Sequence, residues 1–347
     1  MDKNNFLSRL RALGLNALAL LISLTIVLLL MEGVVRLAGL ESASYHSISG
    51  FCKYDAELGW NLVPDRTRVF KGEHFSAVVE ISEQGLRDRL YPLKPEPGRR
   101  RILVIGDSVA WCWGVDIDEC FTKKMERELN DTDVITMGVP GFSTAQELLM
   151  YERDGRQFQS DIVLLAFVGN DPADNLNEHN RPRFRIVDDE LVIKNQPVPR
   201  RKSVVKEWAE KNSRLYVQAK LGAKIAGLLI RSWRDEEPLG KNKYVQPERS
   251  SQIEAVSLSE ALIERFHYSV TEDGARLVIA MIDTAEIYKS SLRNLCSRLG
   301  CQTLDLDPSL ARAAAQGIEI RLKGDPHYSP AGQAVMTKKI IESQVLN

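Results

Sequence analysis

Hydrophobic and polar positions follow one clear pattern from Arg101 onward. Short unbroken apolar runs alternate there with segments whose apolar residues recur at helical spacing. Unbroken runs of this length are typical of strands buried on both faces of a parallel sheet. The predicted strands are 102–105, 134–137, 162–168, 277–282 and a short one around 303–304, and the predicted helices are 121–129, 252–270 and 287–299. The alternation predicts an α/β fold, a three-layer α/β/α sandwich around a doubly wound sheet.

The front of the chain carries a different pattern. Residues 12–31 are twenty consecutive positions without a charge. About twenty apolar residues in a helix span a hydrocarbon core of about 30 Å. Because Lys3, Arg9 and Arg11 precede the run, the positive-inside rule predicts a cytoplasmic N-terminus and an extracytoplasmic remainder. A cleaved secretory signal is the alternative, but the run is longer than a usual signal core and no clear small-x-small cleavage site follows.

These patterns divide the chain into four predicted parts. We expect a cytoplasmic tail at 1–11, a transmembrane anchor at 12–36, an extracytoplasmic lead-in with short strands at 37–99, and an α/β domain at 100–347. Within the lead-in, Ala77–Ile81 has strand character. Pro92–Arg101 is rich in proline and charge, which predicts a linker.

An insertion at about 180–250 interrupts the alternation of strands and helices. Phe184–Val187 and Leu191–Ile193 flank two aspartates and predict a hairpin, and Ser203–Trp233 predicts a long helix. From Arg200 to Arg231 there are nine Lys or Arg against two Glu. A basic helix of this kind is typical of a solvated face, and the alternative is contact with anionic lipid or an acidic glycan.

Charge and cysteine content exclude several classes of protein. The 46 Lys and Arg nearly balance the 47 Asp and Glu, so nothing favours a nucleic-acid partner. The five cysteines form no CxxC and no Cys/His group with zinc spacing, and we expect no metal. We expect buried thiols, with Cys296 and Cys301 as the one candidate disulfide. Gly106–Ser108 lacks the spacing and the lysine of a phosphate-binding loop.

Polar residues follow the carboxyl ends of three predicted strands and recur near the C-terminus. They are Gly106-Asp107-Ser108, Gly138-Val139-Pro140-Gly141-Phe142-Ser143, Gly169-Asn170-Asp171 and Gly324-Asp325-Pro326-His327, the last followed by Ser329-Pro330 and a final helix. In open α/β sheets, functional groups gather at this edge. Each motif alone has a structural alternative, such as a capped turn or a buried histidine. Four motifs in this order predict a shared site.

The chemistry of these residue types favours nucleophilic catalysis. A serine hydroxyl needs a base, and imidazole has a suitable pKa near neutrality. We expect Ser108 to be the nucleophile, His327 its base, and Asp325 the carboxylate that orients His327. The Ser108 N–H, the Gly141 N–H and the Asn170 amide are candidate donors to an oxyanion.

With these blocks the sequence resembles the SGNH/GDSL hydrolase family over about residues 100–345. The resemblance implies a flavodoxin-like sheet, Ser108 as nucleophile, His327 as base and no cofactor. It assigns the second-block glycine to Gly141, with Gly138 as the other choice, and the third-block asparagine to Asn170. Family members hydrolyse carboxylic esters, and some branches move acetyl groups onto or off cell-surface polysaccharides.

One departure concerns the last block, where family members usually have Asp and His three positions apart. Asp325 and His327 are two apart. Asp305 or Asp307, at the end of the fifth predicted strand, is therefore the alternative partner of His327. We expect Asp107 and Asp171 to bond loop backbone instead of taking part in chemistry.

The sequence therefore predicts a single-pass membrane serine esterase that cleaves an acetyl or short-acyl ester at the cell surface. An O-acyltransferase or deacetylase of an exported polysaccharide, and an inactive glycan-binding module, are the alternatives. Membrane-anchored family members also resemble the front of the chain, where the anchor ends near Glu32 and Arg36 and the lead-in contains Gly85-Leu86-Arg87-Asp88. Trp111, Cys112 and Trp113 follow the nucleophile and either line the pocket or pack beneath the loop.

Overall fold

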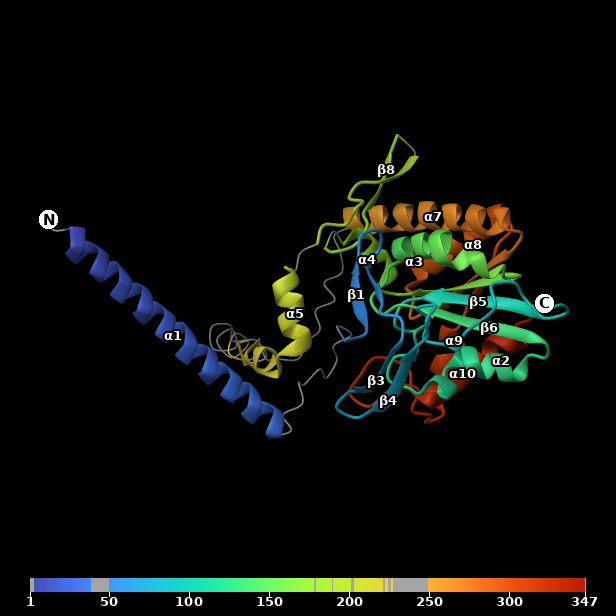
Figure 1. The fold of residues 1–347 in the computed structure, drawn as a ribbon. Coiled ribbons are helices and arrows are strands. Elements are labelled where there is room, and N and C mark those ends of the chain that lie inside the picture. Colours follow the sequence, from blue (N-terminus) through green and yellow to red (C-terminus); the bar gives the residue numbers. More distant parts are fainter. Residues whose placement is uncertain are drawn as a thin grey trace. The chain divides into compact units, whose positions relative to one another are not determined.

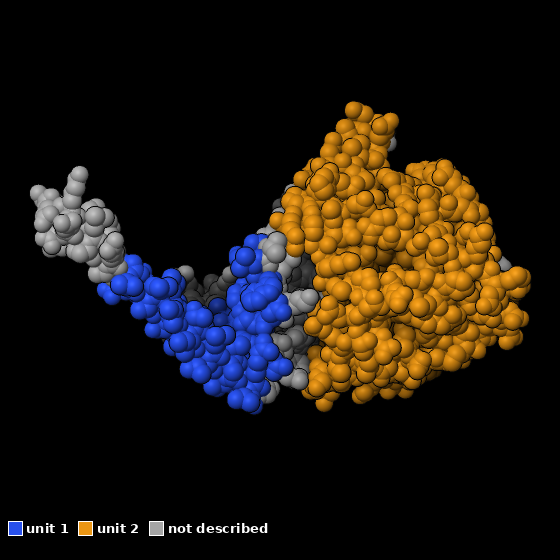
Figure 2. Space-filling view, viewed as in Figure 1, with its two compact units in different colours: residues 1–44, 202–244 blue, residues 45–201, 245–347 orange. Residues whose placement is uncertain are grey.

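The structure, a computed structural model, forms two compact units (Figure 2). It describes residues 3–38, 50–177, 179–188, 190–200, 203–220, 222–223, 226 and 249–346. The first unit comprises residues 1–44 and 202–244, and the second comprises residues 45–201 and 245–347.

The first unit begins with the helix α1 (Lys3–Leu37). Its segment Leu13–Leu37 has a mean hydropathy of 2.6 and is the one helix in the described part of the chain that is long and apolar enough to cross a membrane. This agrees with the predicted anchor in position and length.

The predicted long helix from Ser203 is interrupted. Helix α5 (Val204–Asn212) is followed by Ser213, whose backbone is extended, and residues 214–220 are helical again. The Ser213 hydroxyl accepts a hydrogen bond from the Tyr216 N–H at 3.0 Å, as an N-cap residue does. The single-helix prediction is therefore wrong at Ser213, because a serine there starts a new helix, and its last part, 227–233, lies outside the described residues.

Five parallel strands form the centre of the second unit (Figure 1). Their order across the sheet is β11-β10-β7-β5-β6. Counted along the chain this is the order 2-1-3-4-5 of flavodoxin-like folds, with its switch point between β5 and β7. The strands are β5 (Arg100–Gly106), β6 (Thr132–Gly138), β7 (Ile162–Val168), β10 (Arg276–Ile282) and β11 (Gln302–Asp305). The predicted strands and fold class are confirmed.

Helices cover both faces of this sheet (Figure 1). Leu103 and Ile105 of β5 belong to the core on one face, whereas Ile102 and Val104 belong to the core on the other. This alternation explains why the strands are apolar at every position. Helices α3 (Thr144–Met150), α7 (Arg249–Glu272) and α8 (Glu286–Leu299) cover the first face, and α2 (Phe121–Glu128), α9 (Asp307–Ala315) and α10 (Pro330–Glu342) cover the second.

Shorter elements complete the described fold. They are α4 (Asp171–Leu176), η2 (Ile117–Glu119), η3 (Tyr151–Gly155), η4 (Arg156–Phe158) and the hairpin of β8 (Phe184–Val187) and β9 (Glu190–Ile193). The two hairpin strands pair antiparallel, as the sequence predicted.

The lead-in packs against the α/β core as two antiparallel pairs. Leu58, Phe70 and Val79 are buried in the same core as Leu103. The pairs are β1 (Cys52–Asp55) with β2 (Gly59–Leu62) and β3 (Arg66–Lys71) with β4 (Ser76–Ile81). Residues 50–99 are therefore part of the second compact unit, and a functional division at residue 99 stays a prediction.

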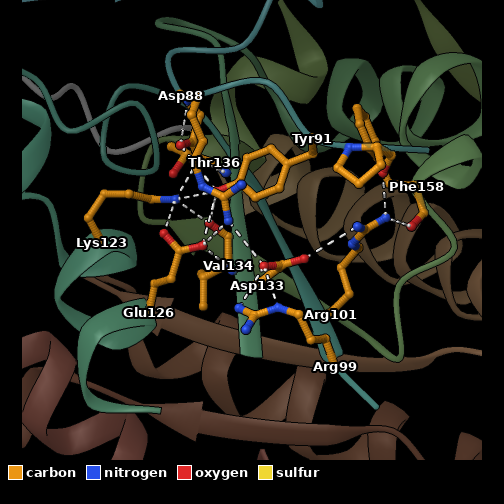
Figure 3. A network of polar contacts seen from close by, with 12 residues as sticks. Asp88, Tyr91, Arg99, Arg101, Lys123, Glu126, Asp133, Val134, Thr136 and Phe158 are labelled. Carbon is orange, nitrogen blue, oxygen red and sulfur yellow. Dashed lines mark hydrogen bonds and ion pairs between the residues drawn. The ribbon is translucent and has the colours of Figure 1, made fainter. Parts of the chain in front are cut away.

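A network of polar contacts holds residues 88–101 to the edge strand β6 (Figure 3). Asp133 accepts hydrogen bonds from Arg99 at 2.9 Å and from Arg101 at 3.3 Å. Lys123 forms an ion pair with Asp88 at 2.7 Å. Arg101 is fully buried and also donates to the carbonyl oxygens of residues 92, 93 and 158. The last residues of the predicted linker are therefore fixed to the sheet, because Arg99 and Arg101 find a partner in Asp133 there.

Four of the five cysteines form disulfides. Cys112 bonds to Cys120, and Cys296 bonds to Cys301, with Cα–Cα distances of 5.5 and 4.6 Å. Cys52 is a thiol. The expectation of buried thiols is wrong for these four, because the fold brings each pair within bonding range.

Candidate active site

Ser108 lies in the turn that follows β5, at the switch point of the sheet. Asp107 shapes this turn, since its Oδ1 accepts the Val109 N–H at 2.8 Å and its carbonyl accepts the Trp111 N–H at 3.0 Å. Gly138 leaves the room for it, because a Cβ there would lie 2.2 Å from the Trp111 nitrogen. The carboxyl ends of β5 and β7 therefore present Ser108 in the crevice where such folds bind ligands.

The structure brings Ser108, His327 and Asp325 into one hydrogen-bonded chain. His327 Nε2 lies 2.8 Å from Ser108 Oγ, and His327 Nδ1 lies 2.6 Å from Asp325 Oδ1. The Asp325 carboxylate also accepts the His327 backbone N–H at 2.9 Å. The Asp325 side chain is 6% exposed and that of His327 is 21% exposed. A base with one nitrogen at a hydroxyl and the other at a buried carboxylate is the arrangement that activates a serine.

Asp305 and Asp307, the alternative partners of His327, are engaged elsewhere. The Lys289 ammonium lies 2.8 Å from Asp305 and 2.6 Å from Asp307. Asp307 also accepts the Asp283 N–H. Of the three candidate carboxylates, Asp325 is the one hydrogen-bonded to His327.

Trp113, in the loop after Ser108, contacts both His327 and Asp325. Its indole stacks on the His327 ring, with the ring centroids 4.7 Å apart and an interplanar angle of 15°. Its Nε1 donates to Asp325 Oδ2 at 3.3 Å. Trp111, in contrast, is fully buried in the core. The two tryptophans thus differ: one packs beneath the loop and the other holds the histidine and its carboxylate.

Contacts behind His327 fix its loop to the sheet. The His327 carbonyl accepts the Leu322 N–H at 2.9 Å. The Tyr328 hydroxyl donates to Asp283, directly after β10, at 2.9 Å. Arg321 donates to the same carboxylate at 2.5 Å and lies over the Tyr328 ring. The loop thereby holds its position relative to the strand ends.

Gly141 lies in the turn after β6 with a left-handed backbone, φ 77°. Residues of the lead-in and insertion hold this turn: Trp60 Nε1 donates to the Pro140 carbonyl at 3.1 Å, and Arg181 donates to the Gly141 carbonyl at 3.2 Å. Within the described ranges, neither the Gly141 N–H nor the Ser108 N–H donates to a protein acceptor. Both can donate to an oxyanion, whereas Gly138 is the last residue of β6 and pairs with Gly106.

Asn170 follows β7 and points its amide at two carboxylates. Its Nδ2 donates to Asp174 Oδ2 at 3.0 Å and to Asp107 Oδ2 at 3.4 Å. The second distance exceeds the usual range for such bonds and indicates a weak interaction. The hydrogen directed at Asp107 is therefore the one that an oxyanion could attract.

Three carboxyl groups are buried near the carboxyl ends of β5 and β7, those of Asp107, Glu147 and Asp171. Burial raises the pKa of Asp107 to about 6. It also raises the pKa values of Glu147 and Asp171, and nearby carboxylates add to this effect. Asp171 Oδ2 accepts the Val168 N–H at 2.8 Å. Glu147 is fully buried and its carboxyl oxygens have no hydrogen-bond partner among the described residues. A neutral Glu147 side chain follows, since an unpaired buried carboxylate is costly.

We expect Glu147→Gln to flatten the loss of stability that accompanies a rise in pH above the usual glutamate pKa. A raised folded-state pKa contributes stability that is fully present below the unfolded pKa and is lost as the pH rises through the folded pKa. The loss is about 1.4 kcal/mol for each pH unit between the two pKa values. Thermal unfolding of the full chain in detergent, at pH 5 and pH 8, measures this difference.

The matched control for that experiment is Glu83→Gln, which removes an exposed carboxylate. It is expected to keep the wild-type dependence on pH. An unchanged pH dependence in Glu147→Gln would show that Glu147 is ionised in the folded protein.

Three residues that support the site are not among the site residues that the sequence predicts. Trp60 and Arg181 hold the Gly141 turn, and Arg87 holds the loop after Ser108. Arg87 is 1% exposed and donates to the carbonyl oxygens of residues 111, 112 and 115 at 2.6–2.7 Å. All three come from segments outside the four motifs, so only the folded chain reveals their positions.

No family model and no curated protein matches the chain. Solved structures do resemble it. A member of the lipolytic protein G-D-S-L family from Veillonella parvula is 12% identical over 71% of this chain and 98% of its own, with a TM-score of 0.39. An acetylxylan esterase from Geobacillus stearothermophilus, solved as a catalytic mutant, is 10% identical over 70% of this chain and 93% of its own, with a TM-score of 0.41. An α/β hydrolase from the metagenome of Lake Arreo, Spain, is 14% identical over 72% and 96%, with a TM-score of 0.40.

With identities of 10–14% and TM-scores of 0.39–0.41, these likenesses are too distant to assign a function to the chain. The chemistry of this site follows from its own residues.

Proposed function

We propose that the protein is a serine esterase of the SGNH/GDSL type that cleaves a carboxylic ester through an acyl-Ser108 intermediate. The observation that carries this proposal is the hydrogen-bonded chain from Ser108 through His327 to Asp325. Such a chain lets the imidazole remove the serine proton as the hydroxyl attacks.

In the first half of the reaction, Ser108 Oγ attacks the ester carbonyl carbon and His327 Nε2 takes the serine proton. The Ser108 N–H, the Gly141 N–H and the Asn170 amide stabilise the oxyanion. His327 then returns the proton to the departing alcohol, and the acyl group stays on Ser108. In the second half, His327 takes a proton from water as that water attacks the acyl carbon, and His327 then gives the proton to Ser108 Oγ as the acid leaves.

Asp325 orients His327 for this role. Its carboxylate fixes the tautomer with the proton on Nδ1, so that Nε2 faces Ser108, and it stabilises the imidazolium that forms. The stacked Trp113 ring limits rotation of the imidazole.

We further propose that the substrate is a short-acyl ester, such as an acetyl group on a surface polysaccharide. We also propose that the ester is cleaved outside the cytoplasm. Two features support the location. The apolar helix Leu13–Leu37 can anchor the chain in a membrane. Two disulfides are typical of an oxidising compartment. A sugar hydroxyl in place of water would make the same site an acyltransferase.

The proposal is tested by trapping the acyl-enzyme. Full-length protein in detergent is mixed rapidly with p-nitrophenyl acetate, and the release of p-nitrophenol is recorded to detect a burst. The reaction is then quenched with acid, and peptide mapping locates the acetyl group. We expect one acetyl group, on Ser108, and acetate release in water. Acetylation elsewhere with an unmodified Ser108 would contradict the proposal, whereas acetylated oligosaccharide formed from an added acceptor would favour the transferase.

A further inference from the structure

The first unit contains a specific contact at the end of α1. Glu32 accepts the backbone N–H groups of Arg214 at 3.0 Å and Leu215 at 2.9 Å, and it also accepts the Ser213 hydroxyl at 2.9 Å. These N–H groups open the helical stretch 214–220 and have no partners within it. A carboxylate at this position accepts hydrogen bonds from these N–H groups and interacts favourably with the positive end of the helix dipole.

Arg36 makes the complementary contact one turn further along α1. Its guanidinium donates to Glu32 at 2.7 Å and to the carbonyl of Asn212 at 2.8 Å. Asn212 is the last residue of α5, where carbonyl oxygens lack helical partners. The Glu32–Arg36 pair therefore binds both sides of the break at Ser213.

The position of this pair in the sequence places it at a membrane surface. Glu32 is the first charged residue after the uncharged run 12–31. If that run spans the hydrocarbon core, its next charged residues lie at the level of the lipid headgroups. Residues 212–215, bonded to the pair, lie at the same level.

The segment that the pair holds exposes apolar and basic side chains together. Val205 and Trp208 of α5 are 73% and 64% exposed. Lys206, between them, is exposed as well. Exposed tryptophan beside basic residues is typical of helices that lie in the interface of a membrane. The sequence of 200–231 has nine basic residues and two acidic ones, a positive balance that favours attraction to anionic headgroups.

We propose that α1 is a retained anchor whose outer end, through Glu32 and Arg36, fastens α5 and residues 213–220 to the surface of an anionic bilayer. The segment would then contact lipid through Trp208 and its basic residues. This inference rests on the membrane anchoring proposed above and not on the esterase chemistry. Removal of α1 as a cleaved signal would also remove the carboxylate that caps residues 214 and 215.

The test uses the full chain in vesicles of phosphatidylglycerol and phosphatidylcholine that carry brominated acyl chains. Bromine quenches tryptophan fluorescence on contact, and the difference between wild type and Trp208→Phe isolates the signal of Trp208. We expect strong quenching of Trp208. In Glu32→Ala we expect loss of that quenching and faster hydrogen exchange in residues 213–220, because their N–H groups lose their acceptor.

Glu83→Ala is the matched control, since it removes an exposed carboxylate of the other unit. It is expected to behave as wild type. Hydrolysis of p-nitrophenyl acetate, measured on the same samples, is expected to be unchanged in Glu32→Ala, so a failure of the esterase proposal is seen separately. An unquenched Trp208, or quenching that survives in Glu32→Ala, would overturn the inference.

Discussion

Ser108→Ala is expected to lower kcat/KM for p-nitrophenyl acetate about 10⁵- to 10⁶-fold, the range typical for removal of a catalytic serine. Without the hydroxyl, His327 has no nucleophile to deprotonate, and the acyl-enzyme route is closed. The oxyanion donors remain, so a small rate above that in water is expected to persist. Steady-state kinetics of the full chain in detergent provide the measurement.

Ser160→Ala is the matched control for this change. Ser160 precedes the amino end of β7, whereas Ser108 follows the carboxyl end of β5, and the Ser160 hydroxyl has no hydrogen-bond partner in the described structure. Its loss is expected to leave kcat/KM near the wild-type value. Equal activity in Ser108→Ala and wild type would rule out Ser108 as the nucleophile.

Asp325→Asn is expected to lower kcat about 10⁴-fold, as replacement of the carboxylate does in other serine hydrolases. The asparagine amide can turn its N–H donor toward His327 Nδ1. The His327 ring then carries its proton on Nε2, and Nε2 cannot take the proton of Ser108. The fold is expected to hold, because the change keeps the shape of the side chain. Kinetics with p-nitrophenyl acetate and circular dichroism spectra test both parts of this prediction.

Asp305→Asn provides the comparison that distinguishes the candidate carboxylates. Asp305 binds Lys289 and Arg293, not His327. Its replacement is expected to weaken local ion pairs and to leave kcat near the wild-type value. A large loss of kcat in Asp305→Asn together with an active Asp325→Asn would reverse the assignment.

The arrangement of the sheet could be predicted because its signal is local. Val163, Leu165 and Phe167 face one core and Leu164 and Ala166 the other, so a run that is apolar at every position indicates a doubly covered strand. The motifs after β5, β6 and β7 could be predicted to meet, because parallel strands bring their carboxyl ends to one edge. The pair Ser329-Pro330 also marked the start of α10, where Ser329 caps the Gly332 N–H.

Other features could not be predicted, because they depend on contacts between distant segments. Arg87 donates to backbone carbonyls some 24 to 28 residues away, and its place in Gly85-Leu86-Arg87-Asp88 does not indicate these partners. The break at Ser213 involves a carboxylate 181 residues earlier in the chain. The Cys112–Cys120 bond depends on the turn at the end of β5, which brings two cysteines without a recognised spacing together.

The sequence by itself determined the alternation of strands and helices, the apolar N-terminal helix, and the residues that can carry nucleophilic chemistry. These follow from hydrophobic periodicity and from the chemistry of the side chains, both of which are local properties. The tertiary structure alone decided that Asp325, and not Asp305 or Asp307, bonds to His327. It also decided that the lead-in is part of the core, because burial and hydrogen-bond geometry arise only when segments far apart in the chain are packed together.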